Sequence, residues 1–430
     1  MNLQTATKFG LKWTTLSSIV LAVIAIFKIA ILTRFLEKSD FGLIAIVLLI
    51  LNFLNLFMDM GLTTAILHKD NISKKVYASI FWLNLFFSVF LYIILVLITP
   101  YITRFYNEPE LNKLIPLMGM SLIISAFGKQ FRTIKQKELK FKTLAIVDIL
   151  TTLISFLFAI YLASNDYKVY TLIYSALLQF VIQNLIFFTI GVSQYGILFH
   201  FKIKETIPFL KIGIYQVGSQ VVNYFNRDLD VLIISKLFGK ELLGGYSLAK
   251  QLIFKPSQVI NPILTKVASP VLAKFQHDLE KLRQNYLKLV NIVWVINLPI
   301  YILFILFAPL IVRVFYGADF ENIIPLVRIL SIYMLIRSIG NPVGSLVIAT
   351  GKTHLEFYWN LSTLVIMPLA IYIGSFYNLI GVTIAITITM LILYYPNWKY
   401  LIYPLIKVSF WEFFKTLSLS KSFKNIKEYI

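Results

Sequence analysis

The sequence contains no cysteine and has little acidic charge. Among its 430 residues, 20 are Asp or Glu and four are His. Without thiols, the chain has neither a disulfide framework nor the thiolate ligands of a structural zinc site. The four histidines lie in separate predicted loops, and the sequence contains no glycine-rich phosphate-binding loop. We therefore expect no metal site and no cofactor.

Apolar residues, in contrast, are abundant and lie in long runs. Hydrophobic residues make up 58% of the chain, and the mean hydropathy is +0.79. This composition is too apolar for a soluble domain, and runs of about 20 apolar residues are long enough to cross a bilayer as helices. We predict an all-α integral membrane protein with about twelve transmembrane helices. Their centres are expected near residues 25, 54, 87, 120, 153, 181, 225, 256, 298, 335, 367 and 389.

The eighth of these spans, residues 246–273, is unusual because it contains Pro256, Pro262 and Pro270. A proline inside a helix removes a backbone hydrogen bond and bends or breaks the helix. The segment is either a broken transmembrane helix or an interfacial one. We favour the broken helix, because an even number of spans agrees with the charge distribution.

The basic loops fall on one side of the predicted topology. The chain has 40 Lys and Arg and a net charge of +20. Cytoplasmic loops of membrane proteins are enriched in Lys and Arg, so we predict that both termini are cytoplasmic. The basic loops contact anionic membrane lipids in this topology, and no nucleic-acid partner is needed to explain the charge. These segments are 69–75, 129–142, 202–211, 266–288 and the chain from 399 onward.

The two halves of the chain resemble each other. Pro100, Arg104 and Pro116 in the first half match Pro309, Arg313 and Pro325 in the second at one constant offset. An even number of spans separates the copies, so the repeats are parallel. We predict an N-terminal six-helix lobe (1–195), a cytoplasmic linker (196–211), a C-terminal six-helix lobe (212–403) and a cytoplasmic basic tail (404–430).

The predicted span near residue 225 carries a polar stripe. Gln216, Gln220, Asn223, Arg227 and Asp230 recur at intervals of three or four residues, which places them on one face of a helix. A cation at the centre of a spanning helix costs roughly 2.5 to 3.5 kcal/mol and usually marks a water-filled pathway. The alternative is a buried structural pair between Arg227 and Asp230.

Cations outnumber anions inside the predicted spans. This excess predicts a central cavity that is net positive and suited to an anionic ligand. The cations are Lys28, Arg227, Lys250, Lys255, Arg328 and Arg337, and the anions are Asp59, Asp148, Asp228 and Asp230.

Several stretches of the sequence resemble a known family. "EKSDFGLIAI", "MDMGLTTAIL", "NRDLDVLIISKLFG" and "IVRVFYGADF" are similar to segments of the Wzx-like polysaccharide flippases of the MOP superfamily, and the resemblance runs along nearly the whole chain. It implies two pseudo-symmetric six-helix lobes of MATE/MOP type around a central cavity. It also implies alternating access that moves undecaprenyl-diphosphate-linked oligosaccharide from the inner to the outer leaflet of the bacterial inner membrane. The products would be O-antigen, capsule or similar surface polysaccharides, and H+ or Na+ would be the coupling ion.

The resemblance assigns roles to the charged and polar residues in the spans. Cations that face the cavity would bind the diphosphate, with Arg227 as the main ligand and Lys28 as a second cation from the facing lobe. The predicted substrate-binding residues are Arg227, Lys28, Arg337, Asn223, Gln220 and Lys250. The residues predicted to act in ion coupling or structural pairing are Asp230, Asp228, Asp59 and Asp148.

Two other functions remain open. A multidrug or small-molecule exporter of the same fold would need a cavity dominated by acidic and aromatic residues, which the cation excess disfavours. A polysaccharide polymerase or glycosyltransferase would need a catalytic site. The tripeptide "DLD" (228–230) imitates a metal-binding motif, but on a helix its two carboxylates point in different directions. We therefore predict that the protein is not an enzyme.

Overall fold

The computed structural model describes residues 3–58, 60–61, 63, 66–67, 72–196 and 198–417, and the described residues form helices joined by short turns. Contacts divide the chain into two compact units, Met1–Gly244 (unit 1) and Gly245–Ile430 (unit 2). Within the described residues, ten segments are long and apolar enough to cross a membrane. The chain is thus a multi-pass membrane protein, and the prediction of an all-α architecture is confirmed.

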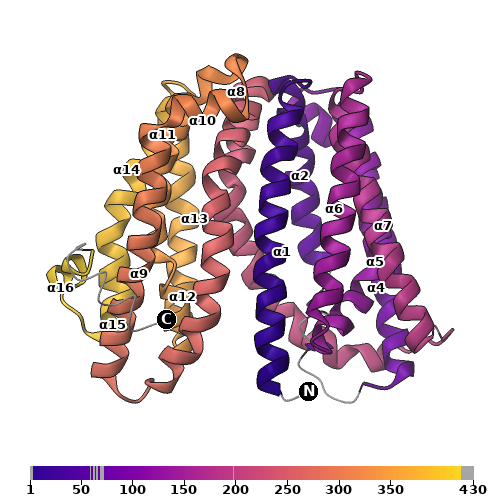
Figure 1. Ribbon diagram of the computed structural model, residues 1–430, viewed down its shortest axis with the longest axis horizontal. Coiled ribbons are helices and arrows are strands. Elements are labelled where there is room, and N and C mark those ends of the chain that lie inside the picture. The colour runs from indigo at the N-terminus through magenta and orange to yellow at the C-terminus, as the bar shows by residue number, and fades with distance from the viewer. Residues whose placement is uncertain are drawn as a thin grey trace. The chain divides into compact units, whose positions relative to one another are not determined.

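Six helices form the bundle of unit 1 (Figure 1). Helix α1 packs against α6, α4 against α5, and α7 against both α5 and α6. Glycines allow α5 and α7 to approach closely, since a Cβ atom on Gly128 would lie 2.5 Å from the Asn184 side chain. The bundle consists of α1 (Leu3–Leu32), α2 (Lys38–Met58), α4 (Lys74–Tyr106), α5 (Leu111–Lys137), α6 (Phe141–Ser164) and α7 (Val169–Tyr195).

Helix α8 (Ile203–Lys274) accounts for the two predicted spans that are missing from the ten. Its backbone leaves the helical conformation at Gly239, where φ is 75°, a value that glycine adopts without a steric penalty. Residues 240–274, including Pro256, are helical. Gly239 thus separates the seventh predicted span from the eighth, and the break predicted among the prolines is wrong: the eighth span is one continuous helix, because a proline weakens a helix without always ending it.

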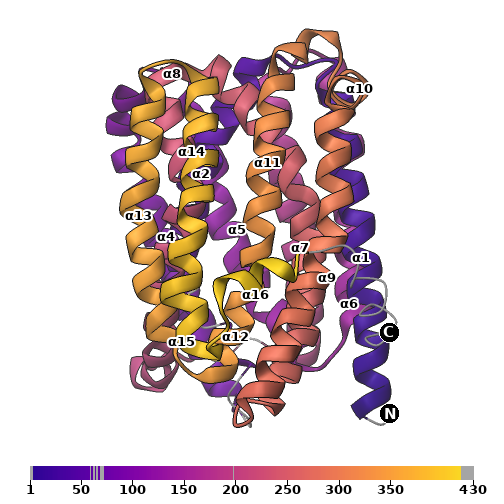
Figure 2. The same cartoon turned by 90° about the vertical axis from the view of Figure 1, so that its left-hand side faces the viewer.

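Unit 2 contains the second part of α8 and the remaining helices. Figure 2 shows α13 and α14 side by side, with α11 and α9 next to them. The helices are α9 (Leu279–Leu306), α10 (Ala308–Phe315), α11 (Ile324–Gly340), α12 (Val343–Thr350), α13 (Thr353–Ser375), α14 (Leu379–Asn397), α15 (Tyr403–Ile406) and α16 (Phe410–Lys415), with a short 3-10 helix η1 (Ala318–Ile323) and a short π-helix η2 (Trp398–Ile402).

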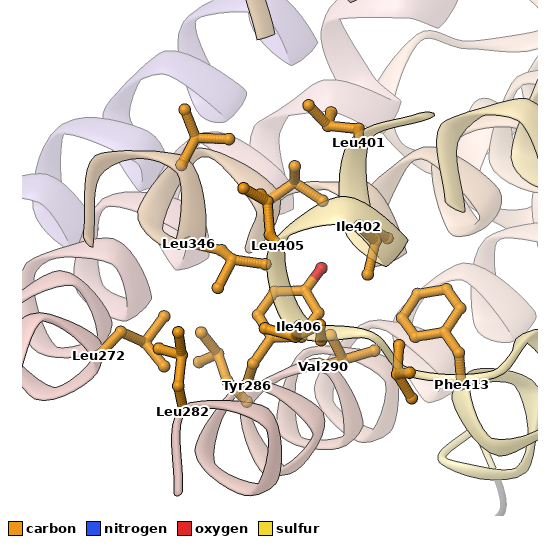
Figure 3. Packing of buried hydrophobic residues seen from close by; sticks show 14 of the residues in the cluster. Leu272, Leu282, Tyr286, Val290, Leu346, Leu401, Ile402, Leu405, Ile406 and Phe413 are labelled. Atoms are coloured by element: carbon orange, nitrogen blue, oxygen red, sulfur yellow. The ribbon is translucent and has the colours of Figure 1, made fainter. Parts of the chain in front are cut away.

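A hydrophobic cluster anchors the start of the predicted tail to unit 2. In Figure 3, Tyr286 lies among Leu346, Leu405 and Ile406, and Phe413 of α16 belongs to the same buried cluster. An ion pair between Arg283 of α9 and Glu412 of α16 also joins these two helices. Residues 410–415 of the predicted tail are therefore packed on α9, while residues 418–430 lie outside the described part of the chain.

Candidate functional site

The first part of α8 is fastened to α2 through one side and exposes the other. The buried Tyr224 hydroxyl donates a hydrogen bond to the Leu49 carbonyl, and its ring lies 5.6 Å from that of Phe53. On the neighbouring positions of the same helix, Asn223 and Arg227 are exposed. The predicted polar stripe thus includes a face that α2 does not cover.

Arg227 is joined to the residue next to it. Its Nε atom and a terminal nitrogen lie 2.8 and 2.7 Å from the same carboxylate oxygen of Asp228, and its guanidinium lies 5.8 Å from the centre of the Tyr224 ring. The Arg227 side chain is still 53% exposed, whereas that of Asp228 is 19% exposed. Asp230 accepts a hydrogen bond from the Val231 amide at 2.8 Å. The predicted positioning of Arg227 by Asp230 stays a prediction.

The other predicted residues of the stripe are less informative. The side chain of Gln220 is half-buried. Asp59, predicted as an ion-coupling or pairing residue, lies outside the described residues, and the side chain of Gln216 is likewise not described.

Lys28 points into the bundle of unit 1. Its ammonium group donates to the hydroxyls of Ser155 on α6 and Ser175 on α7, both at 3.1 Å. The Ser155 hydroxyl in turn donates to the Ser175 carbonyl at 2.7 Å. A cation in a membrane bundle is stabilised when hydroxyl oxygens replace water around it. Lys28 therefore ties α1 to both α6 and α7.

Helices α6 and α7 make further polar contacts with each other. Gln179 of α7 donates to the Thr152 hydroxyl of α6 at 2.9 Å, and Gln183 donates to Asp148 at 2.6 Å. Arg132 of α5 completes the series, with 2.8 Å between its guanidinium and the second oxygen of Asp148. We call this series of contacts, from Lys28 to Arg132, the polar ladder.

The ladder has a signal in the sequence that the charged residues alone do not reveal. Asp148, Thr152 and Ser155 are spaced by four and three residues, and the polar positions of α7 by four and four, so each set lies on one helix face. The charge pattern predicts only Lys28 and Asp148 among the members of the ladder, because those of α6 and α7 other than Asp148 are neutral. Arg132 is missed because it is predicted to lie in a basic loop, whereas it lies in α5. The α7 positions are Ser175, Gln179 and Gln183.

Unit 2 holds two of the predicted substrate-binding cations around one aromatic ring. Lys250 and Arg337 each lie 5.6 Å from the centre of the Phe254 ring, and Lys250 is buried. Arg337 also donates to the hydroxyl of Tyr333 at 2.8 Å. Cation–π contacts hold such side chains without neutralising their charge. We call this group the unit 2 cation cluster.

The predicted linker is fixed to unit 1 by a carboxylate. Glu205 accepts a hydrogen bond from the Ser79 hydroxyl at 2.7 Å and lies 3.0 Å from a ring nitrogen of His200. The Ser79 hydrogen bond, followed by the contact with His200, lowers the pKa of Glu205 below its usual value. The start of α8 is thus attached to α4.

The cations of these sites are suited to binding an anionic ligand. Arg227 offers an exposed guanidinium, and Lys250 and Arg337 offer two cations close together, which fits a phosphate-bearing ligand. Among the described residues, no group of three or more His, Asp or Glu side chains is placed to hold a metal ion.

Comparisons with known proteins agree on one fold. A solved lipid II flippase, MurJ, in an inward closed conformation, is similar with a TM-score of 0.75 and 16% identity, covering 97% of this chain and 91% of that one. A multidrug resistance MATE transporter of the MOP superfamily, in its inward-facing conformation, gives a TM-score of 0.65 and 17% identity, covering 90% of this chain and 98% of that one. The predicted MATE/MOP-like fold is thereby confirmed.

The sequence comparisons identify the family. The lipopolysaccharide biosynthesis protein WzxC of Escherichia coli (strain K12) is 28% identical, covering 97% of this chain and 85% of that protein. A family model described as "Polysaccharide biosynthesis protein" matches residues 31–325, which is more than half of the chain. The chain therefore belongs to this family of polysaccharide biosynthesis proteins.

Proposed function

We propose that the protein is a flippase that moves undecaprenyl-diphosphate-linked oligosaccharide from the inner to the outer leaflet of the bacterial cytoplasmic membrane, by alternating access. The family membership supports a role in polysaccharide biosynthesis, and the fold is one that a lipid II flippase also has. The single observation that carries the proposal is the exposed Arg227 in the first part of α8, the predicted seventh span. Such a charge needs an aqueous pathway or an anionic ligand.

The chemistry of the substrate explains why exposed polar groups are needed on these helices. A sugar head cannot cross hydrocarbon alone, because each unpaired polar group there costs several kcal/mol. Its polyprenyl tail can stay in the lipid. The sugar head can therefore cross along a polar path on the protein while the tail remains in the lipid. No covalent bond changes in this process. We accordingly classify the protein as a transporter and not as an enzyme.

We assign the substrate contacts to two groups of cations. Arg227, with Asn223 and Gln220 on the same helix face, binds the diphosphate, and Asp228 and Asp230 position the guanidinium between cycles. Lys250 and Arg337 supply the second group of cations. Lys28 was predicted as a direct ligand, but its bonds to Ser155 and Ser175 favour a role inside unit 1.

Ion coupling is assigned to the polar ladder. Asp148 is the carboxylate of the ladder, and its contacts with Arg132 and Gln183 would change if it bound H+ or Na+. With both termini cytoplasmic, the basic loops lie against anionic lipids of the inner leaflet. The absence of native cysteine makes this orientation testable with single introduced cysteines at the exposed positions 107 and 140, since position 135 is buried.

The direct test uses purified protein in liposomes. Lipid-linked oligosaccharide is incorporated, and a sugar-modifying reagent that cannot cross the membrane reports which leaflet holds it. We expect the protected fraction to become accessible only when the protein is present, with the mass of the substrate unchanged. A product with added sugar would instead identify a transferase.

The rival transport function is tested in the same liposomes. The fold is also that of a multidrug exporter, which would move a small cationic dye. Dye transport without movement of the lipid-linked sugar would contradict the proposed function.

A further inference from the structure

A pocket of about 950 Å³ opens at one end of unit 1. It is lined by the turn between α1 and α2, by the turn between α6 and α7, and by Glu110 and Lys240. All its lining residues belong to unit 1. This end lies opposite the N-terminus of α1, so in the proposed orientation it is the outer end. The substrate contacts assigned above include none of its residues.

The walls of the pocket are fixed by contacts between helices. The buried Asp40 accepts a hydrogen bond from the Glu37 amide at 3.0 Å and another from the backbone of Val169, which joins the starts of α2 and α7. Lys240 lies 3.0 Å from carboxylate oxygens of both Glu108 and Glu110. The pocket is therefore formed before any ligand arrives, as ligand sites usually are.

Close packing of two backbone segments fixes the side of the pocket that contains Lys240. A Cβ atom on Gly42 would lie 1.8 Å from the Lys240 carbonyl oxygen, and one on Gly244 would lie 1.8 Å from the Lys38 carbonyl oxygen. The start of α2 and residues 240–244 of α8 can therefore touch only because both positions lack a side chain.

The lining offers hydrogen-bond acceptors beside aromatic rings. Glu37 and Asp166 are exposed carboxylates, and Asn165 adds an amide. The lining residues Tyr167, which is 45% exposed, and Tyr170 pack against Tyr174, which does not line the pocket. Their ring centres lie 6.5 and 5.8 Å from the centre of the Tyr174 ring. Sugars present many hydroxyl donors together with apolar C–H faces, and this combination of acceptors and ring faces is complementary to both.

Other ligand classes fit the lining less well. Four carboxylates (Glu37, Asp40, Glu110 and Asp166) outnumber two lysines, so a diphosphate would be repelled. Lys240, one of the lysines, is already paired with two glutamates. A metal ion needs converging ligands, and no such group of side chains occurs within the described residues.

We propose that this pocket is a saccharide-binding site, which receives the sugar head of the lipid-linked oligosaccharide at the outer end of unit 1. The role in transport rests on the proposed function, whereas the affinity for sugar is a property of unit 1 alone. The site recognises hydroxyl groups and ring faces and leaves the diphosphate to the cations of the membrane helices.

Protection of an introduced cysteine tests the site in the full-length protein. Ser39→Cys places a single thiol in the pocket, and Ser193→Cys places one at the exposed far end of α7 as a control. Three probes are compared: oligosaccharide released from its carrier by mild acid, the intact lipid-linked oligosaccharide, and undecaprenyl diphosphate without sugar. We expect the first two to slow maleimide labelling at position 39 about tenfold or more at saturation, and to leave position 193 unchanged.

A ring substitution tests the mode of binding. Tyr167→Ala should weaken protection by the free oligosaccharide about tenfold, equivalent to ~1.4 kcal/mol, whereas Tyr167→Phe keeps the ring and should retain most of it. Tyr161→Ala, an exposed position on α6 that does not line the pocket, is the matched control. Each variant is first required to elute as a single folded species.

The outcomes separate this site from the proposed function. Protection by undecaprenyl diphosphate without sugar, or by none of the three probes, would overturn the saccharide site. If free oligosaccharide protects position 39 while the liposomes show no flipping, the sugar site stands and the flippase function fails. If the liposomes show flipping but no probe protects position 39, the flippase function stands and the sugar site fails.

Discussion

The two units stabilise their membrane cations in different ways. In unit 1, Arg132 meets the carboxylate of Asp148, and Lys28 meets two serine hydroxyls. In unit 2, Lys250 and Arg337 lie against the ring of Phe254. A carboxylate cancels a cation's charge, but a ring face leaves most of its field intact. We infer that, apart from Arg227, unit 1 uses its charges mainly for structure and coupling, and unit 2 for attracting an anion.

The largest expected effect on stability comes from breaking the ion pair between Arg132 and Asp148 in unit 1. Arg132→Leu leaves the partly buried Asp148 without its cation, and because the Arg132 side chain is itself 42% exposed we expect a loss of about 1.5–3 kcal/mol of folding free energy. Thermal unfolding of the purified protein in detergent measures this loss.

The double variant Arg132→Leu/Asp148→Asn sharpens the interpretation. Removing both charges should restore most of the stability, because no buried charge is left unpaired. If stability returns but transport stays absent, Asp148 acts in coupling as well as in structure. A single variant as stable as the wild type would contradict the inferred role of the pair.

A loss of transport without a loss of stability is expected in unit 2. Arg337→Ala removes one of the two cations at Phe254, and we expect liposome transport to fall about 10- to 100-fold, the range of one or two charge-assisted hydrogen bonds. Arg337→Lys should keep part of the activity, because the charge remains but the bidentate fork is lost. Ile332→Ala, at an exposed position of the same helix, is the control. Unchanged transport in Arg337→Ala would contradict the inference that unit 2 uses its cations to attract an anion.

Much of this comparison could not be read from the sequence. Hydropathy located the spans, because apolar length is a property of each segment by itself. The polar stripe also followed from helical spacing. The ladder between α6 and α7 and the ring shared by Lys250 and Arg337 join residues far apart in the chain, so they required the packed bundle. The break predicted in span eight was wrong, because each proline removes only one backbone hydrogen bond and a helix can continue through it.

Arg227 is intermediate between the two patterns, since it has a carboxylate partner and is still exposed. Arg227→Ala should abolish transport, while stability changes by less than about 1 kcal/mol, because exposed ion pairs contribute little. The discriminating variant is Arg227→Ala/Asp228→Ala. A purely structural pair would regain transport when both charges are removed, so restored transport would exclude substrate binding by Arg227.

The smallest expected effect concerns two carboxylates outside the membrane spans, one in each unit. Contacts with the Ser79 hydroxyl and His200 lower the pKa of Glu205, and contacts with the side chain and amide of Lys281 lower the pKa of Asp278, which caps α9. A carboxylate with a lowered pKa stabilises the fold at pH values above its usual pKa, and this stabilisation is lost as the pH falls through the lowered value.

Both carboxylates should therefore make the protein less stable on acidification from pH 6 toward pH 3. Glu205→Gln should flatten the fall in melting temperature, because an amide does not titrate in this range. Asp278→Asn should flatten it as well, while its side-chain oxygen still accepts the bond from the Lys281 amide. Since Glu205 joins α8 to α4 and Asp278 caps only its own helix, Glu205→Gln should also increase proteolysis of the linker at neutral pH, and Asp278→Asn should not. Equal proteolysis of the two variants would show that the Glu205 contact does not hold the linker against unit 1.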